Sequence, residues 1–227
     1  MTETLILAAI LIPCLIVAIV FHEVAHGWTA LALGDPTAKE QRRLSLNPIR
    51  HVDPVGTLIV PGALALFGGP VFGWAKPVPV RKDRLDNPRY GMMAVAAAGP
   101  GTNLVLAAVG AVVLGLVAAS LVAPPAGAME WLVTGLNYFI VINIFLALFN
   151  LLPIPPFDGS HIVEGLLPRS MAAQYARLQQ IGMFLLIALI AITWAFPDSG
   201  VIENVVLPPV EWLREKYLML ALWIAGG

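Results

Sequence analysis

The chain has 227 residues, of which 59% are hydrophobic and only 12% are charged, and its formal net charge at pH 7 is −1. Soluble domains carry about 25% charged residues, so this composition excludes an ordinary soluble domain and favours a chain that lies largely in lipid. A net charge this close to zero also argues against a nucleic-acid partner. We therefore expect one integral membrane domain over residues 1–227.

Four apolar segments are long enough to cross a bilayer, which takes about 20 helical residues. The first covers residues 5–33 and ends at Gly34-Asp35-Pro36, where glycine and proline are typical of a helix end. It starts without basic residues, so we interpret it as a retained helix rather than a cleaved signal peptide, with Cys14 as a buried, inert thiol. The other three segments are residues 90–122, 131–152 and 178–196.

Two further regions differ from these segments. Residues 37–89 are rich in Pro and Gly, and the pieces 57–60 and 74–80 favour extended backbone, so we predict a β-like ribbon or re-entrant loop. Charged residues interrupt the run 205–225, which predicts either an interfacial helix or a fifth span. The predicted fold is an all-α polytopic membrane protein with four to six transmembrane helices and one short β-like ribbon.

The basic residues predict how the chain is oriented in the membrane. Nine of the thirteen Lys and Arg residues lie from Lys39 to Arg89, and Arg169 and Arg177 lie between the third and fourth segments. Basic loops stay in the cytoplasm, so both stretches are expected there. An even number of spans separates them, as this orientation requires.

The segment Phe21-His-Glu-Val-Ala-His26 has the spacing of a zinc-binding helix. His22 and His26 are four residues apart and share one helix face, where both imidazoles can bind one Zn²⁺. Glu23 lies beside them as a general base for water whose pKa the metal lowers toward about 7. The alternative is a polar cluster that packs a helix bundle, although ionisable groups at membrane depth are costly and usually functional.

A catalytic zinc normally has three protein ligands, so one more is needed. Asp158 is the candidate, because it follows the third apolar segment in the proline-broken run 150–159, and unwound backbone at membrane depth is tolerated where it lines a buried or wet site. Its alternative role is to cap the helix that follows. His161 is a rival ligand, whereas Glu40 has basic neighbours and is typical of a solvated charge. His51 is expected to hydrogen-bond with Asp53.

Three asparagines lie in the apolar segments or at their ends. Asn150 and Asn103 are candidate catalytic residues, because a side-chain amide can stabilise an oxyanion or hold a substrate backbone. Asn143 lies on the same face as Asn150 and is assigned to helix packing. Interhelical hydrogen bonding is the alternative for all three.

These motifs together resemble the site-2 protease family of intramembrane zinc metalloproteases. The matching residues are His22-Glu23-x-x-His26, Ala98-Gly-Pro-x-x-Asn103, the run from Asn150 to Asp158-Gly159, and Gly73-Trp-Ala-Lys-Pro-Val-Pro79, which looks like the minimal prokaryotic branch. Phe157 stands where the family normally has Leu. The resemblance implies His22, His26 and Asp158 as zinc ligands, Glu23 as the base, and water access from the cytoplasmic side of a prokaryotic inner membrane. Many members carry a PDZ domain or a pair of CBS domains; the 227 residues leave room for neither, so we expect no regulation through them.

The expected function is therefore the hydrolysis of peptide bonds in transmembrane segments of client membrane proteins, as in regulated intramembrane proteolysis. A client strand is expected to pair with the ribbon at residues 74–80, in the manner of β-strand addition. One alternative is a metal transporter or channel that uses the His-Glu-His cluster, and another is a non-catalytic metal-binding scaffold. The sequence does not specify a client protein or an oligomeric state.

Overall fold

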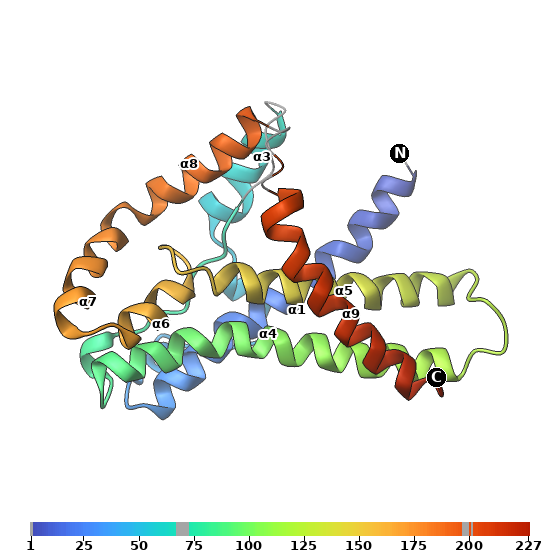
Figure 1. Ribbon diagram of the computed structural model, residues 1–227, viewed down its shortest axis with the longest axis horizontal. Helices are drawn as coiled ribbons and strands as arrows, with labels where there is room; N and C mark the ends of the chain where they lie inside the picture. Colours follow the sequence, from blue (N-terminus) through green and yellow to red (C-terminus); the bar gives the residue numbers. More distant parts are fainter. Residues whose placement is uncertain (1, 67–72, 197–199, 201) are drawn as a thin grey trace.

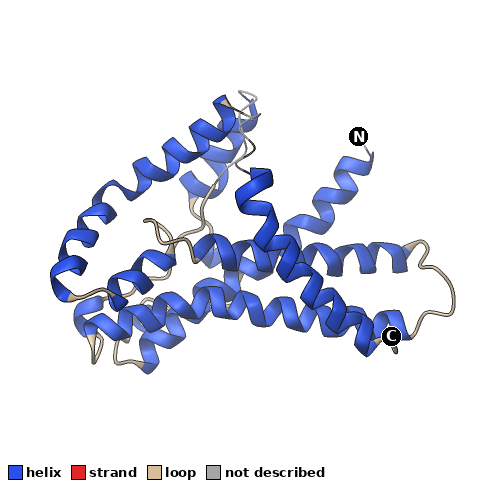
Figure 2. Ribbon diagram, in the orientation of Figure 1, coloured by secondary structure: helices blue, strands red, loops and turns tan. Residues whose placement is uncertain are grey.

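The structure is a computed structural model that describes residues 2–66, 73–196, 200 and 202–227. Within these ranges the chain is helical or irregular and has no strand (Figure 2). The α-helices are α1 (Thr2–Ala32), α2 (Thr37–Glu40), α3 (Val60–Leu66), α4 (Pro88–Ala119), α5 (Ala128–Asn150), α6 (Asp158–Leu166), α7 (Arg169–Tyr175), α8 (Gly182–Ala195) and α9 (Leu207–Ile224). Shorter 3₁₀ and π-helical turns are η1 (Pro48–His51), η2 (Pro54–Ile59), η3 (Lys82–Arg84), η4 (Ala176–Ile181) and η6 (Ile202–Val206).

The core of the molecule lies where α4, α5 and α9 meet. The long helices α4 and α5 run side by side, and α9 crosses both of them (Figure 1). Ala107 and Ala111 of α4 and Ile140 and Ile144 of α5 are fully buried in one cluster. A Cβ atom at Gly115 would lie 2.5 Å from the backbone oxygen of Ala221, so α9 packs directly on the backbone of α4. Small residues allow this close approach, which membrane helices use for van der Waals packing.

Four helical stretches are long and apolar enough to cross a membrane. They are Leu5–Ala32, Pro88–Ala119, Ala128–Asn150 and Arg169–Thr193, which agree with the four predicted segments to within a few residues, except that the fourth begins nine residues earlier than predicted. Large apolar side chains on their outer faces are exposed, as lipid-facing side chains must be. The helical membrane fold is therefore confirmed. The helix α9 is not among these spans in the described structure, and its Val210 and Ala221 are buried in the core.

The prediction for residues 37–89 is partly wrong. Residues 57–60 belong to η2 and α3 rather than to an extended piece, because Asp53-Pro54 starts a helix. The Asp53 carboxylate accepts hydrogen bonds from the N–H groups of Val55 and Gly56, at 3.0 and 2.7 Å. It is therefore not the partner of His51, whose Nε2 atom lies 2.7 Å from the carbonyl oxygen of Ser45. Residues 74–80 are irregular, so the β-like ribbon is not confirmed.

Candidate metal centre

Three predicted ligands converge although they lie on two separate helices. The Nε2 atoms of His22 and His26, both on α1, lie 3.1 and 3.3 Å from the same oxygen, Oδ2 of Asp158, on α6. Metal-binding atoms of the three side chains all lie within 4.8 Å of one another. Zinc bonds of about 2.0–2.2 Å place tetrahedral ligand atoms about 3–4 Å apart, so the three atoms are close to the spacing that one Zn²⁺ needs.

The two imidazoles are held with Nε2 directed at Asp158. The Nδ1 atom of His26 lies 2.7 Å from the carbonyl oxygen of Val95, which can only accept, so His26 carries a proton on Nδ1. The Nδ1 atom of His22 lies 2.6 Å from Oδ1 of Asn103 in the same way. In its neutral form each ring then presents the lone pair of Nε2 to Oδ2 of Asp158, a buried atom that has no hydrogen-bond partner among the described residues. Three acceptors without a donor repel one another, and a bound cation removes that repulsion, so the residues present fit zinc.

Asn103 reaches His22 in one orientation only. Its Nδ2 group donates to the carbonyl oxygen of Ala18 at 3.2 Å and to Oδ1 of Asn143 at 2.8 Å. Asn143 in turn donates its own Nδ2 to the carbonyl oxygen of Phe139 at 2.8 Å. Both asparagine side chains are fully buried, so these partners fix which end of each amide faces which neighbour. Metal-binding histidines commonly need such an outer acceptor for ring orientation.

Two glycines allow the backbones to approach the ligands. A Cβ atom at Gly99 would lie 2.5 Å from Nε2 of His26 and 2.6 Å from Cε1 of His22, so only glycine leaves room for both rings against α4. A Cβ atom at Gly159 would lie 2.2 Å from the carbonyl oxygen of Leu151, so the start of α6 packs directly on the turn that follows α5. Asp158, the residue before Gly159, lies against His22 and His26 of α1. Phe157 is the N-cap residue of α6 and Asp158 is the first residue of the helix, where its carboxylate faces His22 and His26, so the structure does not support the capping alternative.

A cavity of about 890 Å³ opens onto these residues. Its walls are mostly apolar and come from α1, the irregular residues 73–80, α4, α5, α6 and α8. Ligand sites in proteins commonly have volumes of about 300–1,000 Å³, so this cavity is large enough for several residues of an extended peptide. Glu23 and Asn150 line the cavity beside the candidate ligands.

The other predicted site residues occupy different places. Asn103, the other predicted catalytic amide, is fully buried behind His22 and is not among the residues that line the cavity, a place that suits a positioning residue. His161 lines the cavity, but its Nδ1 atom lies 3.2 Å from Nε2 of Gln179, outside the cluster of three ligands. Glu40 forms an exposed ion pair with Arg84, at 2.8 Å.

Backbone groups complete the site, and no side-chain pattern could have shown them. The carbonyl oxygen of Val95 holds His26, and the N–H of Val78 donates to Oε2 of Glu23 at 2.7 Å. Asn143 was visible in the sequence, but the spacing alone pairs it with Asn150 rather than with Asn103.

Comparison with known proteins places the chain among zinc metalloproteases. The model of peptidase family M50 matches residues 117–192. A Bacillus subtilis protein named "Putative zinc metalloprotease YwhC" is 41% identical over 203 residues, which cover 84% of this chain and 86% of that protein. The Mycolicibacterium smegmatis protein "Putative zinc metalloprotease Rip2" is 29% identical over 204 residues, 82% of this chain and 72% of that protein. No solved structure matches the chain.

Proposed function

The chain belongs to peptidase family M50, and from this premise we propose that it cleaves peptide bonds within the transmembrane segments of client membrane proteins. Membership of this family makes it a zinc metalloendopeptidase of the site-2 protease type, and its four apolar spans make it a multi-pass membrane protein. The intramembrane substrate, the role in regulated proteolysis and the residues of the site are the proposed part.

The depth of the candidate site is the observation that carries the proposal. His22 lies ten residues before the end of α1 at Ala32, which is about 15 Å along a helix that rises 1.5 Å per residue. A bilayer core is about 30 Å thick, so the site lies near its middle if α1 spans it. The cavity there has predominantly apolar walls. A peptide bond reaches such a site most directly from a client segment that is itself in the membrane.

We assign His22, His26 and Asp158 as the three zinc ligands, because their donor atoms converge and their remaining hydrogen-bond partners orient them. Zinc bound there would lower the pKa of a water molecule and polarise the scissile carbonyl. Glu23 lines the same cavity and is the residue available to accept the proton from the attacking water.

Asn150 is the proposed donor to the oxyanion. Its side chain lines the cavity, and its Nδ2 group donates to the carbonyl oxygen of Leu146 in the same helix at 2.9 Å. A second proton on the same nitrogen remains available to a substrate oxygen.

The irregular residues 73–80 form one wall of the cavity and supply the backbone against which an unwound client segment can lie. We propose that the client pairs there by β-strand addition. Client proline substitutions beside the cleavage site should then reduce cutting, because proline lacks the N–H that pairing requires. An unchanged cleavage rate would count against this mode of binding.

The competing transporter function has less support. A metal pathway needs metal-binding residues along several spans, yet neither α4 nor α8 contains Asp, Glu or His. The candidate site is instead one closed cluster at a single depth.

Substitution of Glu23 by Gln tests the proposal. The variant should keep zinc but lose cleavage by at least about 10²-fold, the contribution expected from a general base. The assay uses proteoliposomes with a synthetic peptide of about 20 apolar residues that carries a central Asn-Gly pair and a fluorophore–quencher pair. Membrane proteomics of cells with the active enzyme or with Glu23→Gln then identifies natural clients. A fully active, zinc-loaded Glu23→Gln variant would refute the assignment.

A further inference from the structure

A segment outside the metal cluster contacts the proposed catalytic base directly. We call residues 74–81 the strap; it is irregular backbone that precedes η3 and packs against α1. A Cβ atom at Gly27 would lie 2.9 Å from Cγ1 of Val78, so the strap rests on the backbone of α1 one turn after Glu23. The strap and α1 are therefore in contact where the base is located.

Val78 connects the strap to Glu23. The N–H of Val78 donates to Oε2 of Glu23 at 2.7 Å, a short distance typical of a hydrogen bond to a charged acceptor. Val78 stands between Pro77 and Pro79, which have no N–H, so it is the donor that the centre of the strap can offer. One carboxylate oxygen of Glu23 is thus occupied, and the other can turn toward water in the cavity.

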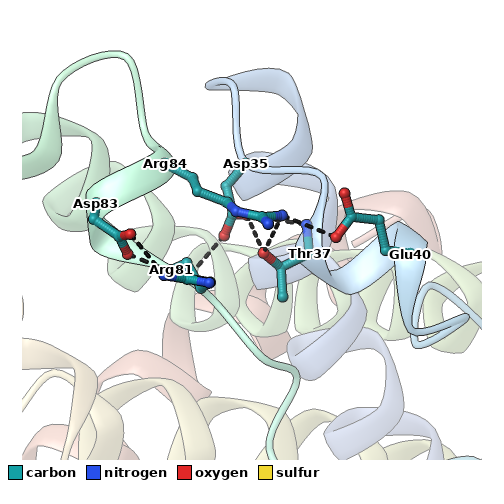
Figure 3. Close-up of polar contacts among 6 residues, drawn as sticks. All are labelled: Asp35, Thr37, Glu40, Arg81, Asp83 and Arg84. Carbon is teal, nitrogen blue, oxygen red and sulfur yellow. Dashed lines mark hydrogen bonds and ion pairs between the residues drawn. The ribbon is translucent and has the colours of Figure 1, made fainter.

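Two buried charged residues hold the strap on either side of Val78. Arg43 donates from Nη2 to the carbonyl oxygen of Lys76 at 2.8 Å. Asp35, which is fully buried at the turn after α1, accepts from the N–H of Arg81 at 2.6 Å (Figure 3). Both bonds reach backbone atoms of the strap, so they fix its path rather than any side chain.

Both carboxylate oxygens of Asp35 accept hydrogen bonds. The oxygen that does not bind Arg81 accepts from the N–H of Thr37 at 2.9 Å and from the Thr37 hydroxyl, so the carboxylate makes three hydrogen bonds without water (Figure 3). Arg84 braces Thr37 from outside through a bond of 3.3 Å to the same hydroxyl. A buried carboxylate with three donors is a rigid anchor, since any movement would leave a charge unpaired.

We propose that Asp35 is a positioning residue of the peptidase, which acts through the strap by holding the Val78 N–H against Glu23. The inference rests on the proposed function in one respect, the role of Glu23 as the base. Asp35 lies nine residues beyond His26, after the end of α1, and belongs neither to the metal cluster nor to the cavity lining.

The first experiment removes the donor. Val78→Pro deletes the N–H and suits extended backbone, and Val78→Ala, which loses only the side chain, is its reference. We expect kcat of Val78→Pro to fall about tenfold to a hundredfold below that of Val78→Ala, as for one lost hydrogen bond to a charged group. KM for the synthetic peptide and the zinc content should agree between the two. Equal kcat values would overturn the proposal.

The second experiment loosens the anchor. Asp35→Asn keeps the shape but offers one acceptor oxygen in place of two, so either Thr37 or Arg81 loses its partner. Asp83→Asn is the matched control, because Asp83 also contacts Arg81 but is exposed and binds only its guanidinium. We expect amide exchange in strap peptides to quicken about tenfold in Asp35→Asn and kcat to fall at constant KM, with neither change in Asp83→Asn.

The outcomes separate this inference from the function on which it rests. Strap exchange in Asp35→Asn that equals the control would overturn the anchor, whether or not the protein is active. An inactive Glu23→Gln variant together with equal rates for Val78→Pro and Val78→Ala would refute the strap alone. An active Glu23→Gln variant would refute the proposed function itself. If Val78→Pro fails to fold, the exchange and kcat of the Asp35→Asn and Asp83→Asn pair decide the question.

Discussion

Single residues around the cluster act mainly by restricting the two imidazoles. In each ring Nδ1 hydrogen-bonds with an acceptor from α4, which is the side chain of Asn103 for His22 and the carbonyl oxygen of Val95 for His26. The other ring nitrogen, Nε2, is left for the metal. The acceptor for His22 is a side chain, so mutation can remove it. The acceptor for His26 is backbone, so mutation cannot.

Asn103→Leu should lower zinc affinity about 10–100-fold, the usual cost of losing an outer partner of a metal ligand, because His22 is then free to rotate and to exchange tautomers. Asn143→Leu should act in the same direction but less, since it reaches His22 only through Asn103. Chelator competition measures both. Asn137→Leu is the control, because Asn137 lies on α5 like Asn143 but donates to the carbonyl oxygen of Val133 in its own helix. Equal zinc affinities for Asn143→Leu and Asn137→Leu would contradict an effect of Asn143 on His22 through Asn103.

Gly99→Ala should abolish zinc binding, because the added methyl group would overlap both imidazoles. Gly101→Ala lies two residues further along α4, where a Cβ atom meets nothing within 4 Å, and should bind zinc normally. Zinc per polypeptide, measured by atomic emission after purification, distinguishes the variants. A Gly99→Ala protein with full zinc would mean that the rings do not pack on α4 in this way.

At the scale of elements, a polar anchor outside the apolar spans couples the end of α1 to the strap. Burial raises the pKa of Asp35, but the hydrogen bonds from Thr37 and from the N–H of Arg81, with the nearby charge of Arg84, hold that pKa below its ordinary value. A lowered pKa means that the ionised carboxylate stabilises the fold. Its contribution is present in full above the ordinary aspartate pKa of about 3.9 and is lost as the pH falls through the lower folded pKa.

The melting temperatures of the natural protein and Asp35→Asn should therefore differ most near neutral pH and converge in acid. Losing one of the buried bonds should cost about 2 kcal/mol, or roughly 4–8 °C for a chain of this size. Thermal unfolding in detergent from pH 3 to pH 7 measures the difference. A difference that stays constant across this range would show that the charge of Asp35 does not contribute to stability. The other charged residues in this cluster are Glu40 and Arg84.

At the scale of the whole molecule, the orientation in the membrane determines from which side water reaches the cavity. The basic loops predict that η1 faces the cytoplasm and that the connection between α4 and α5 faces the other side. In a Cys14→Ala background, Arg50→Cys should react with an impermeant maleimide only in inverted vesicles. Ala126→Cys should react only in intact spheroplasts. The reverse labelling pattern would show that the chain has the opposite orientation in the membrane and that water reaches the cavity from the other side.

The sequence by itself determined the spans and the chemistry. Long apolar runs predict membrane helices, because a helix makes all its backbone hydrogen bonds within one segment and lipid offers no other partners. Four such stretches are present. The pair His22 and His26 was equally local, since four residues along a helix always bring two side chains to one face. Asp158 was predicted as the partner from its proline-broken surroundings, and α6, which packs on α4, brings it to His22 and His26 of α1.

The tertiary structure alone decided the rest. Residues 57–60 have an extended-looking composition, yet the Asp53-Pro54 start makes them helical, because a local cap outweighs weak strand propensity. Asn103 and Asn143 carry the same side-chain amide that a catalytic asparagine would use. Only the packing of α1, α4 and α5 shows that they are buried behind His22. Glu23 and Asp35 both hold the strap through its backbone N–H groups, which every non-proline residue carries. Which of those groups meets a given carboxylate depends on the path of the folded chain.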